Sequence, residues 1–510
     1  MRGRAGWMLV VPMALALIVP AAAAASPSSF DPVVEAQNFS ITGQRPALVS
    51  TPQYQLQLAS QSAGNQLAAT QALAADPERN FATDLCWNGG NGCAGDVRLY
   101  DWASHGYGLV RPVLFTARNG ATISGHVWAT VAGPRHRPGI VITNGSVQAD
   151  EQLYWYAAQA LAKDGYVVLT FDPQGQGQSD TFGEGADAIE GVPAQTDGRP
   201  FYDGTEDAID FFLSTPRHPY EPVPSCSTGT SHAAKQERRV AAGLDAGSNP
   251  FWELLDRSRI GLAGHSYGAA GVSYIGQWDP RVKAIVAWDN LGGPSPQGGE
   301  VPSQTGTGSR TIGEEGCPAD PANRTTVPIT KPALGMSADY GLPATPNLSL
   351  PDPGAKSTQS RAYSAAGVDS GEIVIRGGSH VDFSFIPNQA FGASLRGPDM
   401  TAWYTSAWFD KYLKHDPGAD ARLLTDRWRE DPVERAIDPN HDANAFSFYY
   451  DSRLDIHLAG GGTFDCEDLR QGCPGLVADD GYPGEYSYLS VDTTPDSSRG
   501  GGAGLVPHSP

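Results

Sequence analysis

Beyond its first 25 residues the sequence contains no apolar run long enough to cross a bilayer. A membrane-spanning helix needs about 20 consecutive apolar residues. The segment 1–25 is typical of an export signal, with Arg2 and Arg4 before the apolar core WMLVVPMALALIVP and a small-residue cleavage site before Ser26. Because that core is short for a span, we expect cleavage rather than anchoring. The predicted product is a secreted protein without a membrane span.

Basic residues are also few. The chain has 35 Lys and Arg residues against 56 Asp and Glu residues, which gives a formal net charge of −21. A surface this acidic repels phosphate groups, so we expect neither nucleic acid nor anionic membranes as partners. Hydrophobic residues make up 40% of the chain and charged residues only 18%. This balance favours a packed globular protein and argues against a disordered one.

Cysteines are scarce as well, at six in the whole chain. An even number in an exported protein favours disulfide bonds, and cysteines close in sequence pair most easily. The predicted pairs are Cys86–Cys93, Cys226–Cys317 and Cys466–Cys473. No C-x-x-C motif or histidine pair with zinc spacing accompanies them. We therefore predict no metal site, and no cofactor.

Strand-like and helix-like segments alternate from residue 139 onward, which predicts an α/β fold: a mostly parallel sheet with helices on both faces. An Asn-Gly turn at 119–120 predicts a hairpin just before this region. The expected strands cover 113–116, 123–130, 140–143, 166–171, 260–263, 284–288, 333–336 and 373–376. The expected helices cover 55–75, 151–164, 203–213 and 401–414.

The same pattern suggests how the chain is divided. After the signal we expect an N-terminal extension, 26–109, that packs on a main domain, 110–415. Three loop-rich insertions, at 181–200, 216–250 and 292–330, interrupt that domain at the carboxyl side of the sheet, where ligands bind. A Cys226–Cys317 bond would join the second insertion to the third. A C-terminal extension, 416–510, contains a small disulfide loop and a disordered tail.

One pentapeptide organises the chain, Gly264-His265-Ser266-Tyr267-Gly268. It follows an apolar run and precedes a stretch of small residues that can form a helix. In a strand–turn–helix of this kind the serine hydroxyl is exposed at a strained corner, and the glycines avoid steric clashes. We predict that Ser266 is a nucleophile.

A serine nucleophile needs a histidine base and a carboxylate that orients the base. His380 is the best candidate for the base, because it follows the last expected strand and two glycines. His265 points away from its neighbour Ser266 and is expected to support the turn. Asp339, one strand before the histidine, is the preferred acid. Asp289, after the strand 284–288, is the alternative.

These motifs resemble the α/β-hydrolase superfamily over about 111–415. The resemblance rests on Thr143-Asn144-Gly145-Ser146, on 172–179 (DPQGQGQS), on the pentapeptide, and on Gly377-Gly378-Ser379-His380, in the chain order serine, acid, histidine. The arrangement is similar to secreted bacterial esterases and to the dienelactone-hydrolase-like branch, with serine in place of that branch's cysteine. The loop at 143–145 departs from the usual His-Gly of the superfamily.

The resemblance implies an oxyanion hole with two donors. One is the backbone N–H of Tyr267, which follows the nucleophile at the start of a helix. Ser146 is the second donor by family analogy. The implied function is a secreted carboxylesterase or lipase-like serine hydrolase that acts on small or polymeric esters through an acyl-enzyme. A peptidase or an acyltransferase with the same triad, or a catalytically silent binding protein, are the alternatives.

Overall fold

The computed structural model describes residues 29–81, 94–99, 102–103, 106, 108–146, 150–188, 199–293, 327–425 and 444–476. The export signal, the predicted pair Cys86–Cys93, Cys317 and the C-terminal tail lie outside these residues. No helix in the described part of the chain has the length and apolar character that crossing a membrane would require.

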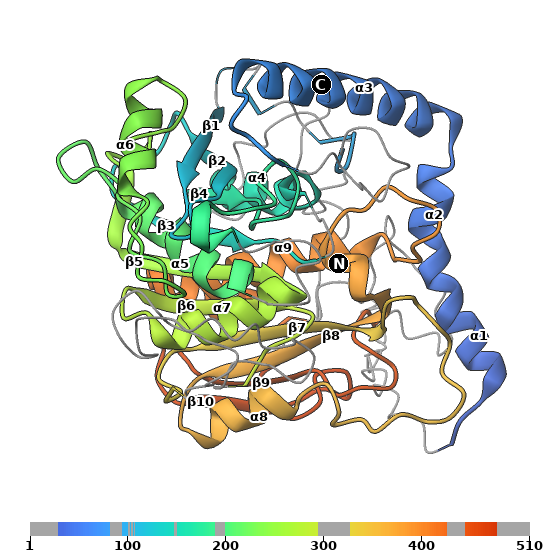
Figure 1. Ribbon diagram of the computed structural model, residues 1–510. Coiled ribbons are helices and arrows are strands. Elements are labelled where there is room, and N and C mark those ends of the chain that lie inside the picture. Colours follow the sequence, from blue (N-terminus) through green and yellow to red (C-terminus); the bar gives the residue numbers. More distant parts are fainter. Residues whose placement is uncertain are drawn as a thin grey trace, which may run out of the picture.

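A ten-stranded sheet forms the centre of the described structure (Figure 1), with the order β1-β2-β4-β3-β5-β6-β7-β8-β9-β10. The strands from β4 to β8 run parallel, and an antiparallel pair flanks them at each end. Their bounds are β1 Gly108–Thr116, β2 Thr122–Thr130, β3 Arg137–Thr143, β4 Val167–Phe171, β5 Leu255–His265, β6 Val282–Trp288, β7 Ala333–Tyr340, β8 Ser370–Ser379, β9 Arg453–His457 and β10 Thr463–Cys466.

The parallel strands are apolar because both of their faces are covered. In β3, Ile140 and Ile142 pack into the core on one face of the sheet, whereas Val141 packs into the core on the other. All three side chains are fully buried. Burial of one such side chain contributes roughly 1.5–3 kcal/mol, so the continuous apolar runs in the sequence are the main reason that this sheet is central.

Helices cover both faces of the sheet. α4 (Trp155–Lys163) and α9 (Arg396–Phe409) contribute to one hydrophobic core. α5 (Arg199–Leu213), α7 (Tyr267–Trp278) and α8 (Thr358–Ala365) contribute to the other. The prediction of a mostly parallel sheet with helices on both faces is confirmed. The expected strands all fall within or overlap observed strands, with boundaries that differ by a few residues.

The two extensions are integral parts of the fold. β9 of the C-terminal extension pairs with β8, and β10 follows it as the edge strand of the same sheet. The expected boundary at residue 415 therefore does not separate a structural unit. Within the second insertion, 216–250, an additional helix forms, α6 (Ala233–Ala241). A short helix, α10 (Ala419–Leu423), packs beside α9.

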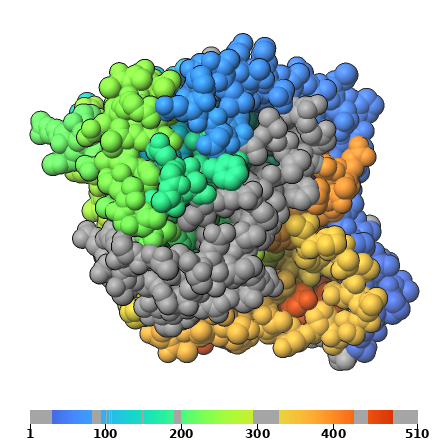
Figure 2. Space-filling view, in the orientation of Figure 1, coloured from blue at the N-terminus to red at the C-terminus, as the bar shows by residue number. Residues whose placement is uncertain are grey.

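The N-terminal extension forms three helices, α1 (Pro32–Ser40), α2 (Gln44–Val49) and α3 (Pro52–Ala75). They run along one side of the molecule and across its end (Figure 1), and they lie at the rim of the face in Figure 2. The extension is fastened to the late chain by backbone hydrogen bonds, from Arg45 N to Ala393 O (3.1 Å) and from Ala393 N to Thr42 O (2.8 Å). This segment is thus in contact with the part of the chain around Ala393.

The disulfide predictions have different outcomes. Cys466 and Cys473 are bonded as predicted, with their Cα atoms 5.9 Å apart. This bond closes the loop after β10. Cys226 is also disulfide-bonded, but its predicted partner, Cys317, lies outside the described residues.

Candidate active site

Ser266 lies at the sharp turn between β5 and α7. Its backbone has φ 58° and ψ −119°, a conformation that costs energy for a residue with a Cβ atom. The turn is tight on both sides. A Cβ atom on Gly264 would lie 2.4 Å from the carbonyl oxygen of Gly268, and one on Gly268 would lie 2.3 Å from that of Thr143. The glycines of the pentapeptide are therefore required by backbone contacts, as the motif predicts.

Asp289 leaves the sheet beside Ser266. The neighbouring strands β5 and β6 are in register at His265 and Trp288, and Ser266 N donates to the carbonyl oxygen of Trp288 at 2.9 Å. Ser266 and Asp289 each follow one member of this pair. Asp289 also has a positive φ, 45°. Two adjacent strands thus end in residues with strained backbones, a feature that is common at functional sites.

His380 follows β8 at the same edge of the sheet, and its side chain contacts Asp289. The Nδ1 atom of His380 forms a short hydrogen bond with Oδ2 of Asp289. Burial opposes the ionisation of Asp289, but the charge of His380 and this hydrogen bond hold the pKa of Asp289 below its ordinary value. An ionised carboxylate accepts the Nδ1 proton and leaves Nε2 available as a base.

Asp339, the preferred acid from the sequence, does not contact His380 in this way. Its Oδ2 accepts from Nδ2 of Asn38 at 2.8 Å and from the backbone N of Gly377 at 2.7 Å. Its Oδ1 accepts a short hydrogen bond from Ser447. Burial raises the pKa of Asp339, whereas an orienting acid must stay ionised. The alternative, Asp289, therefore replaces Asp339 as the partner of His380.

The reason for this correction is the length of β7. The sequence suggested a strand that ends at residue 336, which would place Asp339 in the following loop. The observed strand continues to Tyr340, and its residues after Met336 still pair with β8. Asp339 is consequently held inside the sheet, where α1 and the segment after 444 cover it. Asp339 joins the two extensions to the end of β8.

The N-terminal extension also supports the segment that carries His380, which the sequence did not reveal. Arg45 is fully buried. Its guanidinium donates to the carbonyl oxygens of Val381 and Ser384, each at 2.7 Å, and to that of Asp382 at 3.3 Å. Backbone carbonyls accept from both terminal nitrogens of this cation, and nothing in the sequence around residue 45 distinguishes it from a surface arginine.

Two further carboxylates near the site have structural roles. Ser379 caps the short helix that begins at His380, and Asp382 in the helix completes a reciprocal pair of hydrogen bonds with it. Asp382 is fully buried. Asp172 accepts from Asn144 Nδ2 at 3.1 Å and from Gln178 N at 2.9 Å. It thereby fixes the two loops that follow β3 and β4.

The loop after β3 lies against the serine. A Cβ atom on Gly145 would be 3.1 Å from the Cβ atom of Ser266. Ser146, the expected second oxyanion donor, follows directly, and its buried hydroxyl has no hydrogen-bond partner. Tyr267, the expected first donor, is the first residue of α7. The N–H groups of a helix's first turn point out of its end and favour a negative charge there.

No hydrogen bond joins Ser266 to His380 in the described structure. The ring of His380 lies 4.7 Å, centroid to centroid, from that of His265, the residue before the nucleophile. In ligand-free hydrolases the contact between nucleophile and base is often loose and tightens when substrate binds. The positions of Ser266, His380 and Asp289 are thus compatible with a catalytic triad.

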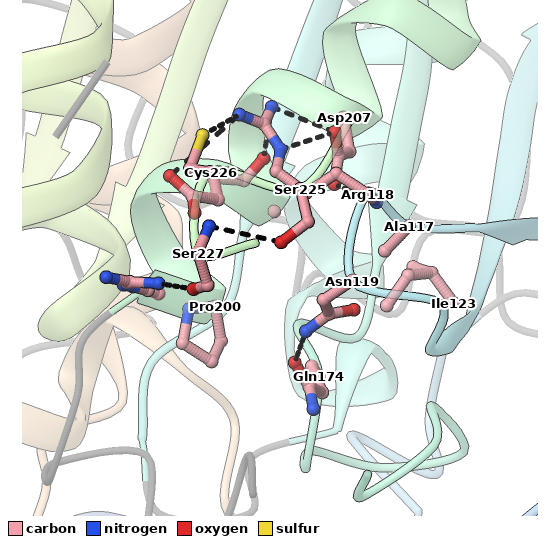
Figure 3. A pocket seen from close by; sticks show the side chains of 13 residues that line it. Ala117, Arg118, Asn119, Ile123, Gln174, Pro200, Asp207, Ser225, Cys226 and Ser227 are labelled. Atoms are coloured by element: carbon pink, nitrogen blue, oxygen red, sulfur yellow. Dashed lines mark hydrogen bonds and ion pairs between the residues drawn. The ribbon is translucent and has the colours of Figure 1, made fainter. Parts of the chain in front are cut away.

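A small pocket lies near this edge of the sheet (Figure 3), between the β1–β2 turn, the start of α5 and the loop 225–227. Arg118 is one of the charged residues that line it, and its guanidinium forms ion pairs with Glu206 at 3.1 Å and Asp207 at 2.8 Å. Nη1 of Arg118 also lies 3.5 Å from Sγ of Cys226. This contact anchors the second insertion to the main sheet.

The pocket is connected through α5 to the turn at Ser266. The ring of Phe201, near the start of α5, stacks on that of Tyr267, with centroids 5.4 Å apart. α5 therefore lies between this pocket and Tyr267, one of the candidate oxyanion donors.

Comparisons with known proteins do not identify a relative. A scan against protein-family models and a search of curated proteins found no match to this chain. Among the described residues there is also no group of three or more His, Cys, Asp or Glu side chains that could hold a metal ion. The functional assignment therefore depends on the geometry at Ser266, Asp289 and His380.

Proposed function

We propose that this protein is a secreted serine hydrolase with an α/β-hydrolase fold, and that it cleaves carboxylic esters through an acyl-enzyme. The observation that carries the proposal is the hydrogen bond between Asp289 and His380 at the sheet edge where Ser266 occupies a strained turn. A histidine whose Nδ1 is held by a carboxylate can act as a general base toward a partly exposed serine at the same end of the sheet.

The reaction follows from these positions. The Nε2 atom of His380 takes the proton from Ser266 Oγ as that oxygen attacks the carbonyl carbon of the ester. Asp289 keeps the Nδ1 proton in place and stabilises the imidazolium that forms. His380 then protonates the departing alcohol, and the acyl group remains on Ser266. A water molecule, deprotonated by His380, attacks the acyl-enzyme and releases the carboxylic acid.

The oxyanion of each tetrahedral intermediate needs preorganised donors. The backbone N–H of Tyr267, at the start of α7, and the loop at Gly145-Ser146 are the candidates. Donors fixed in position before the reaction stabilise developing charge without a reorganisation cost, and removal of one costs about 100- to 1,000-fold in rate. The buried hydroxyl of Ser146, which lacks a partner, supports a role for this loop in binding the substrate oxygen.

A fluorophosphonate probe tests the proposal directly. Such probes phosphonylate only an activated serine. We expect the native protein to be labelled at Ser266, Ser266→Ala to be unlabelled, and Asp289→Asn to be labelled much more slowly. Absence of labelling in the native protein, or equal labelling of Ser266→Ala, would reject the hydrolase assignment and favour a binding protein.

Substrate preference is measured with a panel of esters of increasing acyl length and matched peptide amides. The proposal predicts hydrolysis of esters with burst kinetics when the leaving group is good. Faster turnover of the amides would show instead that the protein is a peptidase. Transfer of the acyl group to an added alcohol in preference to water would show that it is an acyltransferase.

A further inference from the structure

His265, which the proposed reaction does not use, lies in a chain of three hydrogen bonds. The backbone N of Gly145 donates to the hydroxyl of Tyr154 at 3.0 Å. That hydroxyl is 2.8 Å from Nδ1 of His265, and Nε2 of His265 is 2.8 Å from the carbonyl oxygen of His380. The chain starts at the candidate oxyanion loop and ends on the backbone of the candidate base.

The two ends of this chain have fixed directions, and a neutral His265 fixes the bond between them. A carbonyl oxygen can only accept, so Nε2 of His265 carries a proton and donates it to His380. The amide of Gly145 can only donate, so the hydroxyl of Tyr154 accepts from it and has its own proton free for Nδ1. In the neutral form of His265 the proton is therefore on Nε2, and Nδ1 accepts from Tyr154. A second proton on Nδ1 would face the hydroxyl of Tyr154 and remove the acceptor.

The surroundings of His265 favour this neutral form. Its side chain is buried, and the charged or titratable groups around it are His380, Asp289 and Arg45. Burial and the neighbouring charge of His380 lower the pKa of His265 to about 3. The ring is also fixed by contacts, with the centroid of Tyr154 5.8 Å away and that of Phe383 6.0 Å away.

We propose that His265 is a positioning residue, a neutral link that holds the oxyanion loop at Gly145 and the backbone of His380 at a fixed separation, with Tyr154 completing the link. This inference rests on the proposed hydrolase function. The oxyanion donors act on the carbonyl oxygen and the base acts on Oγ of Ser266, and in the transition state both oxygens are bonded to the same carbon. Their separation must therefore be set within a fraction of an ångström, and a misplacement of about 1 Å costs on the order of 100-fold in rate.

Neither loop is held at this spacing by sheet hydrogen bonds alone. β3 and β8 are not neighbours, because β5, β6 and β7 lie between them. His265, the last residue of β5, forms one hydrogen bond with the hydroxyl of Tyr154 and another with the carbonyl oxygen of His380. The link thus spans the nucleophile from the donor loop to the base.

Two tyrosine variants form the test. Tyr154→Phe removes the central hydroxyl of the link. Tyr156→Phe is the matched control, because Tyr156 is equally buried and its hydroxyl donates to the carbonyl oxygen of Phe383 at 2.7 Å, outside the link. Tyr154→Phe loses the two hydrogen bonds of the link that its hydroxyl makes, and Tyr156→Phe loses the one to Phe383, at about 1 kcal/mol of stability for each bond. We expect Tyr154→Phe to lower kcat about 10- to 100-fold with a change in KM below about threefold. Tyr156→Phe is expected to stay within about twofold of native.

A second measurement does not depend on activity. In Ser266→Ala protein with ¹⁵N-labelled histidine, NMR at pH 5–8 should show His265 neutral with the proton on Nε2. A proton on Nδ1, or a charged ring at pH 6, would overturn the inference, and this measurement decides the matter if Tyr154→Phe does not fold.

The outcomes separate the inference from the function on which it rests. If the native protein reacts with esters but the two tyrosine variants lose kcat equally, or neither loses it, the link has no positioning role and the hydrolase assignment stands. If the native protein does not react with a fluorophosphonate, the hydrolase assignment fails, and the positioning role fails with it.

Discussion

The two candidate acids, Asp289 and Asp339, give the most discriminating prediction. The same substitution should lower kcat at Asp289 and the unfolding free energy at Asp339. In Asp289→Asn the new amide can donate to Nδ1 of His380. That bond favours the tautomer with its proton on Nε2, which cannot accept the proton of Ser266. Triads that lose their acid in this way lose about 10⁴-fold in kcat, or roughly 5 kcal/mol of transition-state stabilisation.

The effect of Asp339→Asn should be on stability. The carboxylate accepts from Asn38 and Gly377 through one oxygen and from Ser447 through the other. An amide oxygen can keep the first two bonds, and the hydroxyl of Ser447 can turn to accept from the new NH₂ group. The charge is lost, and hydrogen bonds to charged groups contribute about 1.5–3 kcal/mol each. We expect a loss of about 1–3 kcal/mol in unfolding free energy, and kcat within a few-fold of native.

The assay compares the two variants in parallel. Urea denaturation gives the unfolding free energy. Hydrolysis of an activated ester gives kcat, and it is measured at a low temperature at which both variants are folded. The reasoning is refuted if Asp339→Asn loses about 10⁴-fold in kcat while Asp289→Asn remains active. Equal effects of both substitutions on kcat would also contradict it, since only Asp289 contacts the base.

Three further predictions concern the turn at Ser266, the N-terminal extension and pH. Gly268→Ala should abolish activity and prevent native folding, because its Cβ atom would lie 2.3 Å from the carbonyl oxygen of Thr143; soluble, active protein would contradict this. Arg45→Met should lower the unfolding free energy by roughly 3 kcal/mol or more and reduce kcat, since it frees the segment after His380; unchanged melting and kcat would refute the assigned role. The folded-state pKa of His265, about 3, lies below its ordinary value of about 6.5, so its contribution is complete above about pH 6.5 and is lost as pH falls. The unfolding free energy should decrease by about 2 kcal/mol between pH 6.5 and pH 5 from this residue, and His265→Gln should lack that part of the decrease.

The sheet was predictable because its signals are local. The apolar run at 140–142 is buried on both faces, and such runs in alternation with amphipathic helices imply parallel strands. Ser266 was predictable for the same reason, since the glycines that permit the strained turn are its immediate neighbours in the sequence. His380 followed from its place after the last parallel strand.

The local sequence does not specify which carboxylate contacts His380. Asp339 and Asp289 both follow apolar strands, and the sequence does not show that β7 continues to Tyr340 or that Asn38 covers Asp339. Arg45 was invisible for a similar reason, because its partners are backbone carbonyls more than 300 positions away. No side-chain pattern records such a contact.

The sequence by itself thus determined the class of fold, the strained turn at Ser266 and the position of the candidate base His380, because residues close in the chain specify each of them. Tertiary structure alone decided which carboxylate meets the base, how the two extensions complete the sheet and brace the site, and how His265 joins the loop at Gly145 to His380. These outcomes depend on strand length, register and packing between distant segments, and they become definite only when the whole core is assembled.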